Sequence, residues 1–295
     1  MNRSDLIRNS AAAGLLSAAL PVPVQATEAK TPAPIAPLAP PAGGVPVAFL
    51  LSEGAVLIDF AGPWEVFHDA DVAGRTQSAF NLYTVAETTK PLKVGGDLTI
   101  VPQYSFADAP APNVVVVPAQ AKPTAATKQW LIDTAKHADL VMSVCTGALV
   151  LAQAGLLDGH SVTTHHSAFT TLAMSYPKVT VVHGVRFVDD GAIATSAGLS
   201  AGIDLALHVV ARYYGKETAR STAYDMEYQS NSWLDAANDA YRRPPTPPAG
   251  LATCPVCWMT IDPKISPSLS YGGKRYYFCM TEHEHVFASA PERFL

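Results

Sequence analysis

The chain is predicted to fold as an α/β domain with a mainly parallel sheet, followed by a short C-terminal segment of different composition. Over residues 45–235, short apolar runs typical of buried strands alternate with longer stretches of helical periodicity. Two proline-rich stretches, 27–44 and 236–250, interrupt this pattern and are predicted to be linkers. Three of the four cysteines lie within 251–295, whereas the fourth, Cys145, stands alone in mid-chain.

Several apolar runs are predicted to be strands, and helical patterns lie between them. The predicted strands are Val45–Leu51, Phe80–Ala86, Val114–Val117, Leu140–Val144, Ser161–Thr164, Val185–Val188 and Ile193–Thr195. The predicted helices are Trp64–Ala70, Thr124–His137, Gly147–Ala154, Ser167–Tyr176 and Ala201–Tyr214. Ligands of parallel α/β sheets bind beyond the carboxyl ends of the strands, so residues that follow these strands are the first candidates for a site.

Composition and charge exclude some classes of function. The chain has 295 residues, of which 48% are hydrophobic and 15% charged, as in a globular protein with a sizeable core. Its net charge is −5, and no stripe of lysine or arginine provides an electrostatic surface for nucleic acid.

The N-terminus, residues 1–26, is predicted to be a Sec-type signal peptide. Arg3 and Arg8 precede the apolar stretch Ala11–Leu20, and Val24-Gln25-Ala26 fits a cleavage site. The apolar stretch is too short to span a bilayer stably, so we expect an exported, periplasmic protein with no membrane attachment after cleavage. The alternative is a disordered or buried N-terminal helix. Export would place the cysteines in an oxidising compartment, where disulfides compete with metal binding.

Cys145 is the strongest candidate for a reactive residue. An apolar strand ends on it in Val141–Ala148, and small residues and a helical pattern follow. Such a turn projects the sulfur at the carboxyl end of the strand, beside the N-terminus of a helix. The partial positive charge and the free N–H groups of that terminus are expected to favour a thiolate. The alternative is an inert buried cysteine.

A nucleophilic thiol needs an acid or base beside it and donors for the negative charge that develops on the substrate. Asp59 lies alone in an apolar stretch after the first strand, and His165 follows another strand. Ala119 follows Val114–Val117 and could present its backbone N–H beside that of Thr146. All of them are expected to converge on one rim of the sheet. The alternatives are a helix N-cap for Asp59 and a structural role for His165.

Residues 45–235 resemble the DJ-1/PfpI family, within it the isonitrile hydratases and the amidase-like domains of some AraC-type regulators. The matching stretches are Ile58–Val66, Cys145–Ala148, Leu156–Gly159, Thr163–His165, Thr195–Gly198 and Ala201–Asp204. The resemblance implies a flavodoxin-like three-layer sandwich, a reactive cysteine on a strained elbow, no cofactor and a homodimer. It implies Cys145 as the nucleophile and Asp59 as the acid that bonds the sulfur or transfers protons. Thr146 and His165 take the positions of assisting residues.

One position departs from the family pattern. Relatives commonly have two glycines after the strand-end proline, where the backbone forms an oxyanion hole. This chain has Ala119 and Gln120 there. Alanine resists positive φ, so the hole is expected to be imperfect, which affects the prediction of catalysis and not that of the fold.

The C-terminal segment has the spacing of a metal site or a disulfide module. Cys254-x2-Cys257 is followed by Cys279-x3-His283, with a predicted hairpin turn at Tyr271–Lys274 between the pairs. A C-x2-C turn places two sulfurs on one ion, and a second pair a hairpin away can close a tetrahedron. So short a segment buries little apolar surface and usually needs a metal or disulfides. A disulfide between two of the three cysteines is the alternative, against which the odd number argues.

Residues 251–295 resemble the YHS domain, a small metal-associated module. The resemblance rests on Cys254–Met259, Gly273–Cys279, Phe287 and Pro291–Phe294, with His283 where members often have a fourth cysteine. A Cys₃His set suits Zn²⁺, whereas nearby Met259, Met280 and His285 would add the soft ligands that suit Cu(I). Zinc or copper is therefore expected, and the choice between them stays open.

The leading hypothesis is an exported protein in which Cys145 hydrates or hydrolyses a small electrophile, fused to a metal-binding module. The rival is a non-catalytic periplasmic protein that handles copper or zinc or senses redox conditions. A transcription regulator has less support, because no DNA-binding helix pair follows the larger domain. The expected partners are a small-molecule substrate, a metal ion and a second copy of the chain, with no nucleic acid.

Overall fold

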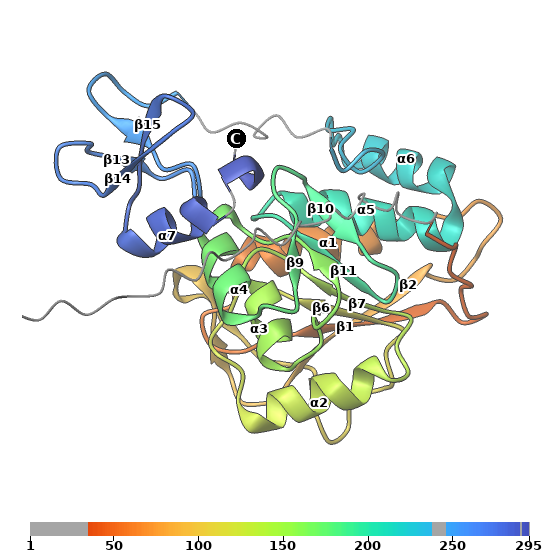
Figure 1. The fold of residues 1–295 in the computed structure, drawn as a ribbon. Coiled ribbons are helices and arrows are strands. Elements are labelled where there is room, and N and C mark those ends of the chain that lie inside the picture. The colour runs from red at the N-terminus through yellow and green to blue at the C-terminus, as the bar shows by residue number, and fades with distance from the viewer. Residues whose placement is uncertain (1–34, 238–245, 290, 295) are drawn as a thin grey trace, which may run out of the picture. The chain divides into compact units, whose positions relative to one another are not determined.

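The computed structural model describes residues 35–237, 246–289 and 291–294, and its fold is drawn in Figure 1. The predicted signal peptide and part of each predicted linker lie outside these ranges. Among the described residues, no helix has the length and apolar character needed to cross a membrane.

A seven-stranded sheet forms the centre, with the strand order β10-β11-β7-β6-β1-β2-β5. All neighbouring strands in it run parallel except β10 and β11. The strands are β1 (Val45–Leu50), β2 (Phe80–Ala86), β5 (Tyr104–Ser105), β6 (Val114–Val117), β7 (Leu140–Ser143), β10 (Phe187–Asp189) and β11 (Ile193–Ser196). The predicted α/β class with a mainly parallel sheet is confirmed.

Helices cover both faces of this sheet, which makes three layers (Figure 1). On one face pack α1 (Leu57–His68), α5 (Ala201–Tyr214) and α6 (Lys216–Asp225). On the other pack α2 (Ala125–Ala135), α3 (Gly147–Gln153) and α4 (Phe169–Ser175). Because the central strands are covered on both sides, their sequences are continuous apolar runs. The four valines of β6, for example, have no exposed surface.

Short elements complete this part of the chain. A small hairpin pairs β3 (Leu92–Lys93) with β4 (Thr99–Ile100). The predicted strand Ser161–Thr164 is wrong as a strand of the central sheet: only β8 (Ser161–Val162) forms, and it pairs with β9 (Thr180–Val181). Pairing stops there because the N–H of Thr163 bonds the Thr195 hydroxyl and not a strand carbonyl.

The first helix also differs from its prediction. It begins at Leu57 and not at Trp64, so Asp59 lies in its first turn and not at the end of a strand. Pro63, which favours the start of a helix, lies inside this one. The ring removes a hydrogen bond to the carbonyl of Asp59, but burial of Pro63 and Phe60 in the core holds the helix together. The polar helix α6 is an element that the sequence pattern did not predict.

The C-terminal segment builds its own small core. It contains β12 (Ala252–Thr253), β13 (Thr260–Ile261), β14 (Ser268–Tyr271), β15 (Lys274–Tyr277) and α7 (Thr281–Ser289). The predicted turn between β14 and β15 is confirmed, with positive φ at Gly272 and Gly273, as a two-residue hairpin requires. Val256, Phe278 and Phe287 are buried together in this segment. The boundaries that separate it from residues 45–235 as a domain stay a prediction.

The turn that leads from β7 into α3 leaves no room for a side chain at Gly147. A Cβ atom there would lie 2.1 Å from the carbonyl oxygen of Val117 and 2.9 Å from that of Pro118. Both obstacles are backbone atoms of the neighbouring strand end, so they cannot move aside cheaply. The turn therefore depends on glycine at this position.

Gly147→Ala should lower the free energy of unfolding by about 1–3 kcal/mol, the usual cost of overpacking. Denaturant unfolding measures the change. Gly43→Ala is the matched control, because a Cβ atom there meets nothing within 4 Å. Equal unfolding midpoints for the two variants would show that the turn tolerates a side chain.

Candidate active site and candidate metal centre

Cys145 lies on a strained turn between β7 and α3. Its φ of +58° is in the left-handed region, which is uncommon for a residue with a side chain. Its N–H donates to the carbonyl oxygen of Ala197 at 3.1 Å, and its own carbonyl accepts the hydroxyl of Thr164 at 2.7 Å. The side chain is 7% exposed. The strand–cysteine–helix turn is present, and Thr164, which the sequence pattern did not single out, anchors it.

Asp59 reaches this cysteine from the first turn of α1. Its side chain has no exposed surface, and its Oδ2 accepts the backbone N–H of Ala119 at 3.1 Å. Oδ1 has no hydrogen-bond partner, and the thiol of Cys145 lies close enough to the carboxyl group to lower its pKa against the effect of burial. The structure thus brings together an acid and a thiol that lie far apart in the sequence.

Burial decides the protonation of this pair. It raises the pKa of Asp59 to about 6, against the opposing effect of the Ala119 N–H. Burial and then the charge of Asp59 raise the pKa of Cys145 to about 11, although the N–H groups of Thr146 and Leu199 act in the other direction. At neutral pH the site therefore holds a thiol beside a carboxylate. The prediction of a thiolate is therefore wrong for the site without substrate, because burial raises the pKa of the thiol by more than the N–H donors lower it.

The two backbone donors expected to form an oxyanion hole are both engaged inside the site. The N–H of Thr146 bonds the sulfur of Cys145, and the N–H of Ala119 bonds Asp59. Neither Ala119 nor Gln120 adopts positive φ. The side chain of Thr146 makes no capping bond to α3, so its hydroxyl is not used in starting that helix.

His165 is placed differently from the other candidates. Its Nδ1 pairs with the hydroxyl of Ser167 at 2.8 Å, and its ring packs on Gly198, where a Cβ atom would lie 2.2 Å from the ring. Burial and then the neighbouring His166 lower its pKa. No hydrogen bond joins this half-buried ring to Cys145 or Asp59. Its position therefore favours the structural alternative.

The buried carboxylate should make the fold less stable above pH 6. An unfolded aspartate releases its proton near pH 4, whereas folded Asp59 keeps its proton until about pH 6. The folded state holds more protons across this window, so stability falls as the pH rises from 4 to 6 and stays low above it. Asp59→Asn should remove this loss.

We expect Asp59→Asn to stabilise the protein by about 1–3 kcal/mol at pH 8 and to change little at pH 4. Chemical denaturation at the two pH values measures the difference. Asp133→Asn, on the exposed surface of α2, is the control for removal of a charge. A gain of equal size at both pH values would contradict burial as the cause.

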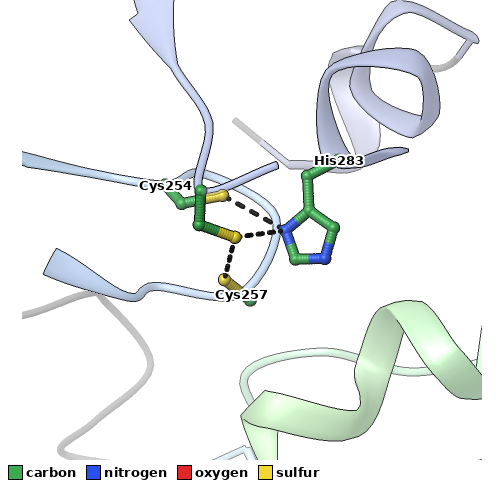
Figure 2. Close-up of side chains that lie close together, drawn as sticks. Cys254, Cys257 and His283 are labelled. Atoms are coloured by element: carbon green, nitrogen blue, oxygen red, sulfur yellow. Dashed lines mark hydrogen bonds between the residues drawn. The ribbon is translucent and has the colours of Figure 1, made fainter. Parts of the chain in front are cut away.

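The C-terminal segment gathers three cysteines and a histidine into one cluster, of which Figure 2 labels Cys254, Cys257 and His283. One potential ligand atom from each of the four residues lies within 4.8 Å of the others. Nδ1 of His283 lies 3.4 Å from the sulfur of Cys254 and 3.1 Å from that of Cys279. The sulfurs of Cys257 and Cys279 are 3.5 Å apart, and all are free thiols.

This geometry fits a tetrahedral metal ion. Ligand atoms at Zn–S and Zn–N bond lengths stand roughly 3.3–3.8 Å apart around one ion. Backbone N–H groups point at the sulfurs: those of Cys257 and Cys279 at Cys254, and that of Met259 at Cys257. Donors of this kind stabilise thiolates and orient them as ligands. Hydrogen bonding, first of all from Cys257, lowers the pKa of Cys254. The residues predicted as ligands are therefore brought together and can hold a metal.

Purified protein reconstituted under reducing conditions should bind one equivalent of Zn²⁺ or Cu(I). His283→Ala should weaken binding by more than the roughly 10–100-fold typical of losing an outer-shell contact. For Zn²⁺, His285→Ala is the matched control, because that histidine lies on the same helix but outside the four-residue cluster. Competition with a chromophoric chelator measures both affinities. Equal affinities would remove the metal centre.

An α/β sandwich with a buried acid beside a cysteine on a strained strand–helix turn defines a class of proteins with a reactive-cysteine elbow. Residues 45–212 match the model of the DJ-1/PfpI family, and the chain belongs to this family.

Known relatives share this domain and differ in function. An isonitrile hydratase of Pseudomonas putida is 32% identical over 191 residues, 62% of this chain and 78% of the relative. The transcriptional regulator CdhR of Pseudomonas aeruginosa is 35% identical over 130 residues, 44% of this chain but only 34% of the regulator. A solved ThiJ/PfpI family protein from Pseudomonas syringae superposes with a TM-score of 0.57 at 28% identity, over 64% of this chain and 77% of that one.

A shorter match is to a protein of a different class. A copper-transporting P-type ATPase of Rhizobium leguminosarum is 48% identical over 42 residues, which are 14% of this chain and 5% of the ATPase.

Proposed function

We propose that this protein adds water to the terminal carbon of a small isonitrile, with Cys145 as the nucleophile and Asp59 as the proton carrier. The observation that carries the proposal is the buried pair itself. A carboxyl group with a pKa of about 6 lies beside a thiol with a pKa of about 11, so it can accept the thiol proton as the sulfur attacks. The similarity to an isonitrile hydratase over most of that enzyme supports the choice of substrate class.

The first step joins sulfur to carbon. Asp59 takes the thiol proton as the sulfur of Cys145 attacks the isonitrile carbon. The carboxyl group then gives that proton to the same carbon, which leaves a thioimidate, R–N=CH–S–Cys145. A carboxyl group is suited to both transfers because its pKa lies near the working pH.

The second step adds water. Asp59 removes a proton from water as the oxygen attacks the thioimidate carbon, and it passes the proton to the nitrogen. The adduct R–NH–CH(OH)–S–Cys145 then collapses: the C–S bond breaks, the hydroxyl proton returns through Asp59 to the sulfur, and a formamide, R–NH–CHO, leaves. We assign the Thr146 hydroxyl, which caps no helix, to orienting the water. The sum is one isonitrile and one water consumed for one formamide.

The pH dependence tests this assignment. Activity should require ionised Asp59, so kcat/KM should rise with pH through an apparent pKa near 6 and then stay level to at least pH 9. Cys145→Ser and Asp59→Asn should each lower kcat/KM at least about 100-fold, as expected when a nucleophile or a general base is removed. Formamide production from a small alkyl isonitrile measures the rate.

His165→Asn is the contrasting variant. The ring of His165 bonds neither Cys145 nor Asp59, so this substitution should lower kcat/KM by less than about 10-fold. Full activity in Cys145→Ser, or a profile that rises only above pH 8, would refute the proposed mechanism.

The C-terminal cluster favours a second function, the capture of copper or zinc. Three thiolates suit both ions, and the exposed thioethers of Met259 and Met280 favour Cu(I). The 42-residue match to a copper-transporting ATPase, about as long as this segment, supports copper. A bound ion would cross-link the parts of the segment that carry its ligands. Competition between Cu(I) and Zn²⁺ on Cys145→Ser protein would separate this function from the chemistry at Cys145.

We also propose that the chain is exported to the periplasm and forms a homodimer. These two statements rest on the N-terminal sequence pattern and on the family resemblance. The mass of the mature protein after expression with its own N-terminus tests cleavage near Ala26. Sedimentation tests the dimer.

A further inference from the structure

The turn that follows β6 is fastened to the loop that follows β1. The side-chain amide of Gln120 accepts the hydroxyl of Ser52 at 2.9 Å and donates to the carbonyl of Leu50 at 3.2 Å. One residue further on, the N–H of Ala121 donates to the carbonyl of Glu53 at 3.0 Å. The turn therefore has three hydrogen bonds to the end of β1 and the loop after it.

These bonds hold Ala119 in one orientation. Its carbonyl accepts the N–H of Val56 at 2.8 Å, and its N–H donates to Asp59 at 3.1 Å. Turning the N–H of Ala119 toward a substrate would rotate the peptide group between Pro118 and Ala119 and break its bond to Asp59, while the carbonyl in the next peptide group stays bound to Val56. A glycine at position 120 would remove the side-chain anchor and could adopt positive φ, which frees the peptide group between residues 119 and 120 and, with it, the backbone of Ala119.

We propose that Ser52 and Gln120 form a clamp that selects the reaction of this site, by keeping the Ala119 N–H on Asp59 and away from the substrate. The inference rests on the proposed function and goes beyond it, because it names positioning residues that touch neither the substrate nor Cys145. It also explains why the site tolerates the replacement of the family's glycine pair.

The clamp separates two classes of chemistry. Attack of a thiolate on an ester or amide puts negative charge on the carbonyl oxygen, which needs N–H donors aimed at it. Attack on an isonitrile puts the charge on carbon, where the proton carried by Asp59 neutralises it. A site with its Ala119 donor clamped on the carboxyl group thus supports addition to isonitriles and opposes acyl transfer.

The test uses Ser52→Ala and Gln120→Gly, with Ser52→Thr as the variant that keeps the hydroxyl. Three rates are measured for each: isonitrile hydration, hydrolysis of p-nitrophenyl acetate, and alkylation of Cys145 by iodoacetamide, each between pH 4 and 10. Gln129→Ala is the control for loss of a glutamine, because Gln129 is exposed on α2 and its amide donates to Asp133.

In Ser52→Ala and Gln120→Gly we expect hydration to fall roughly 10–100-fold, as for a small misplacement of a catalytic group. The inflection assigned to Asp59 should move up by about one pH unit, because its N–H partner is released. Ester hydrolysis should rise relative to hydration. Ser52→Thr should retain the wild-type profile.

An unchanged inflection in both variants, or a Ser52→Thr variant as impaired as Ser52→Ala, would overturn the clamp. Failure of the wild type to hydrate any isonitrile would refute the proposed function instead. The alkylation profile of Cys145 would still test the clamp, because it reports on Asp59 without any substrate.

Discussion

The carboxyl group of Asp59 is the interaction on which the site depends. It lies with no exposed surface between the N–H of Ala119 and the thiol of Cys145, and so it ties α1 to the ends of β6 and β7. A buried carboxylate with one unpartnered oxygen is unfavourable for the fold unless something compensates it. Here the core on both faces of the sheet provides the rigidity that keeps the carboxyl group in place.

This arrangement changes how the reactivity of Cys145 is understood. The N–H groups of Thr146 and Leu199 lower the pKa of its thiol, yet burial and the adjacent carboxylate raise that pKa by more. In the proposed mechanism the sulfur is therefore activated at the moment of attack, by transfer of its proton to Asp59, and not by prior ionisation. The strained φ at Cys145 serves the same end, because it aims the sulfur at the acid while Thr164 and Ala197 hold the backbone.

The C-terminal cluster follows a different physical rule. Its small core of Val256, Phe278 and Phe287 buries little surface, so a bound metal ion would contribute directly to folding. The local sequence places its ligands: a C-x2-C turn, a glycine hairpin and one helical turn from Cys279 to His283. The buried acid–thiol pair, by contrast, needs elements far apart in the chain, which is why the two cysteine chemistries differ in how far the sequence reveals them.

The sequence by itself determined the α/β class, the central strands, the turn at Cys145 and the C-terminal cluster of cysteines and histidine, because periodicity and short-range spacing encode these features. Only the tertiary structure decided that Asp59 lies within α1, that His165 turns to Ser167, and that the Ala119 N–H is held on Asp59 by Ser52 and Gln120. The tertiary structure also decided that Cys145 is a neutral thiol at neutral pH. Burial and hydrogen bonds between residues that are distant in the chain set the contacts of Asp59 and Ala119, and packing against Gly198 sets the ring of His165, so no local sequence pattern encodes them.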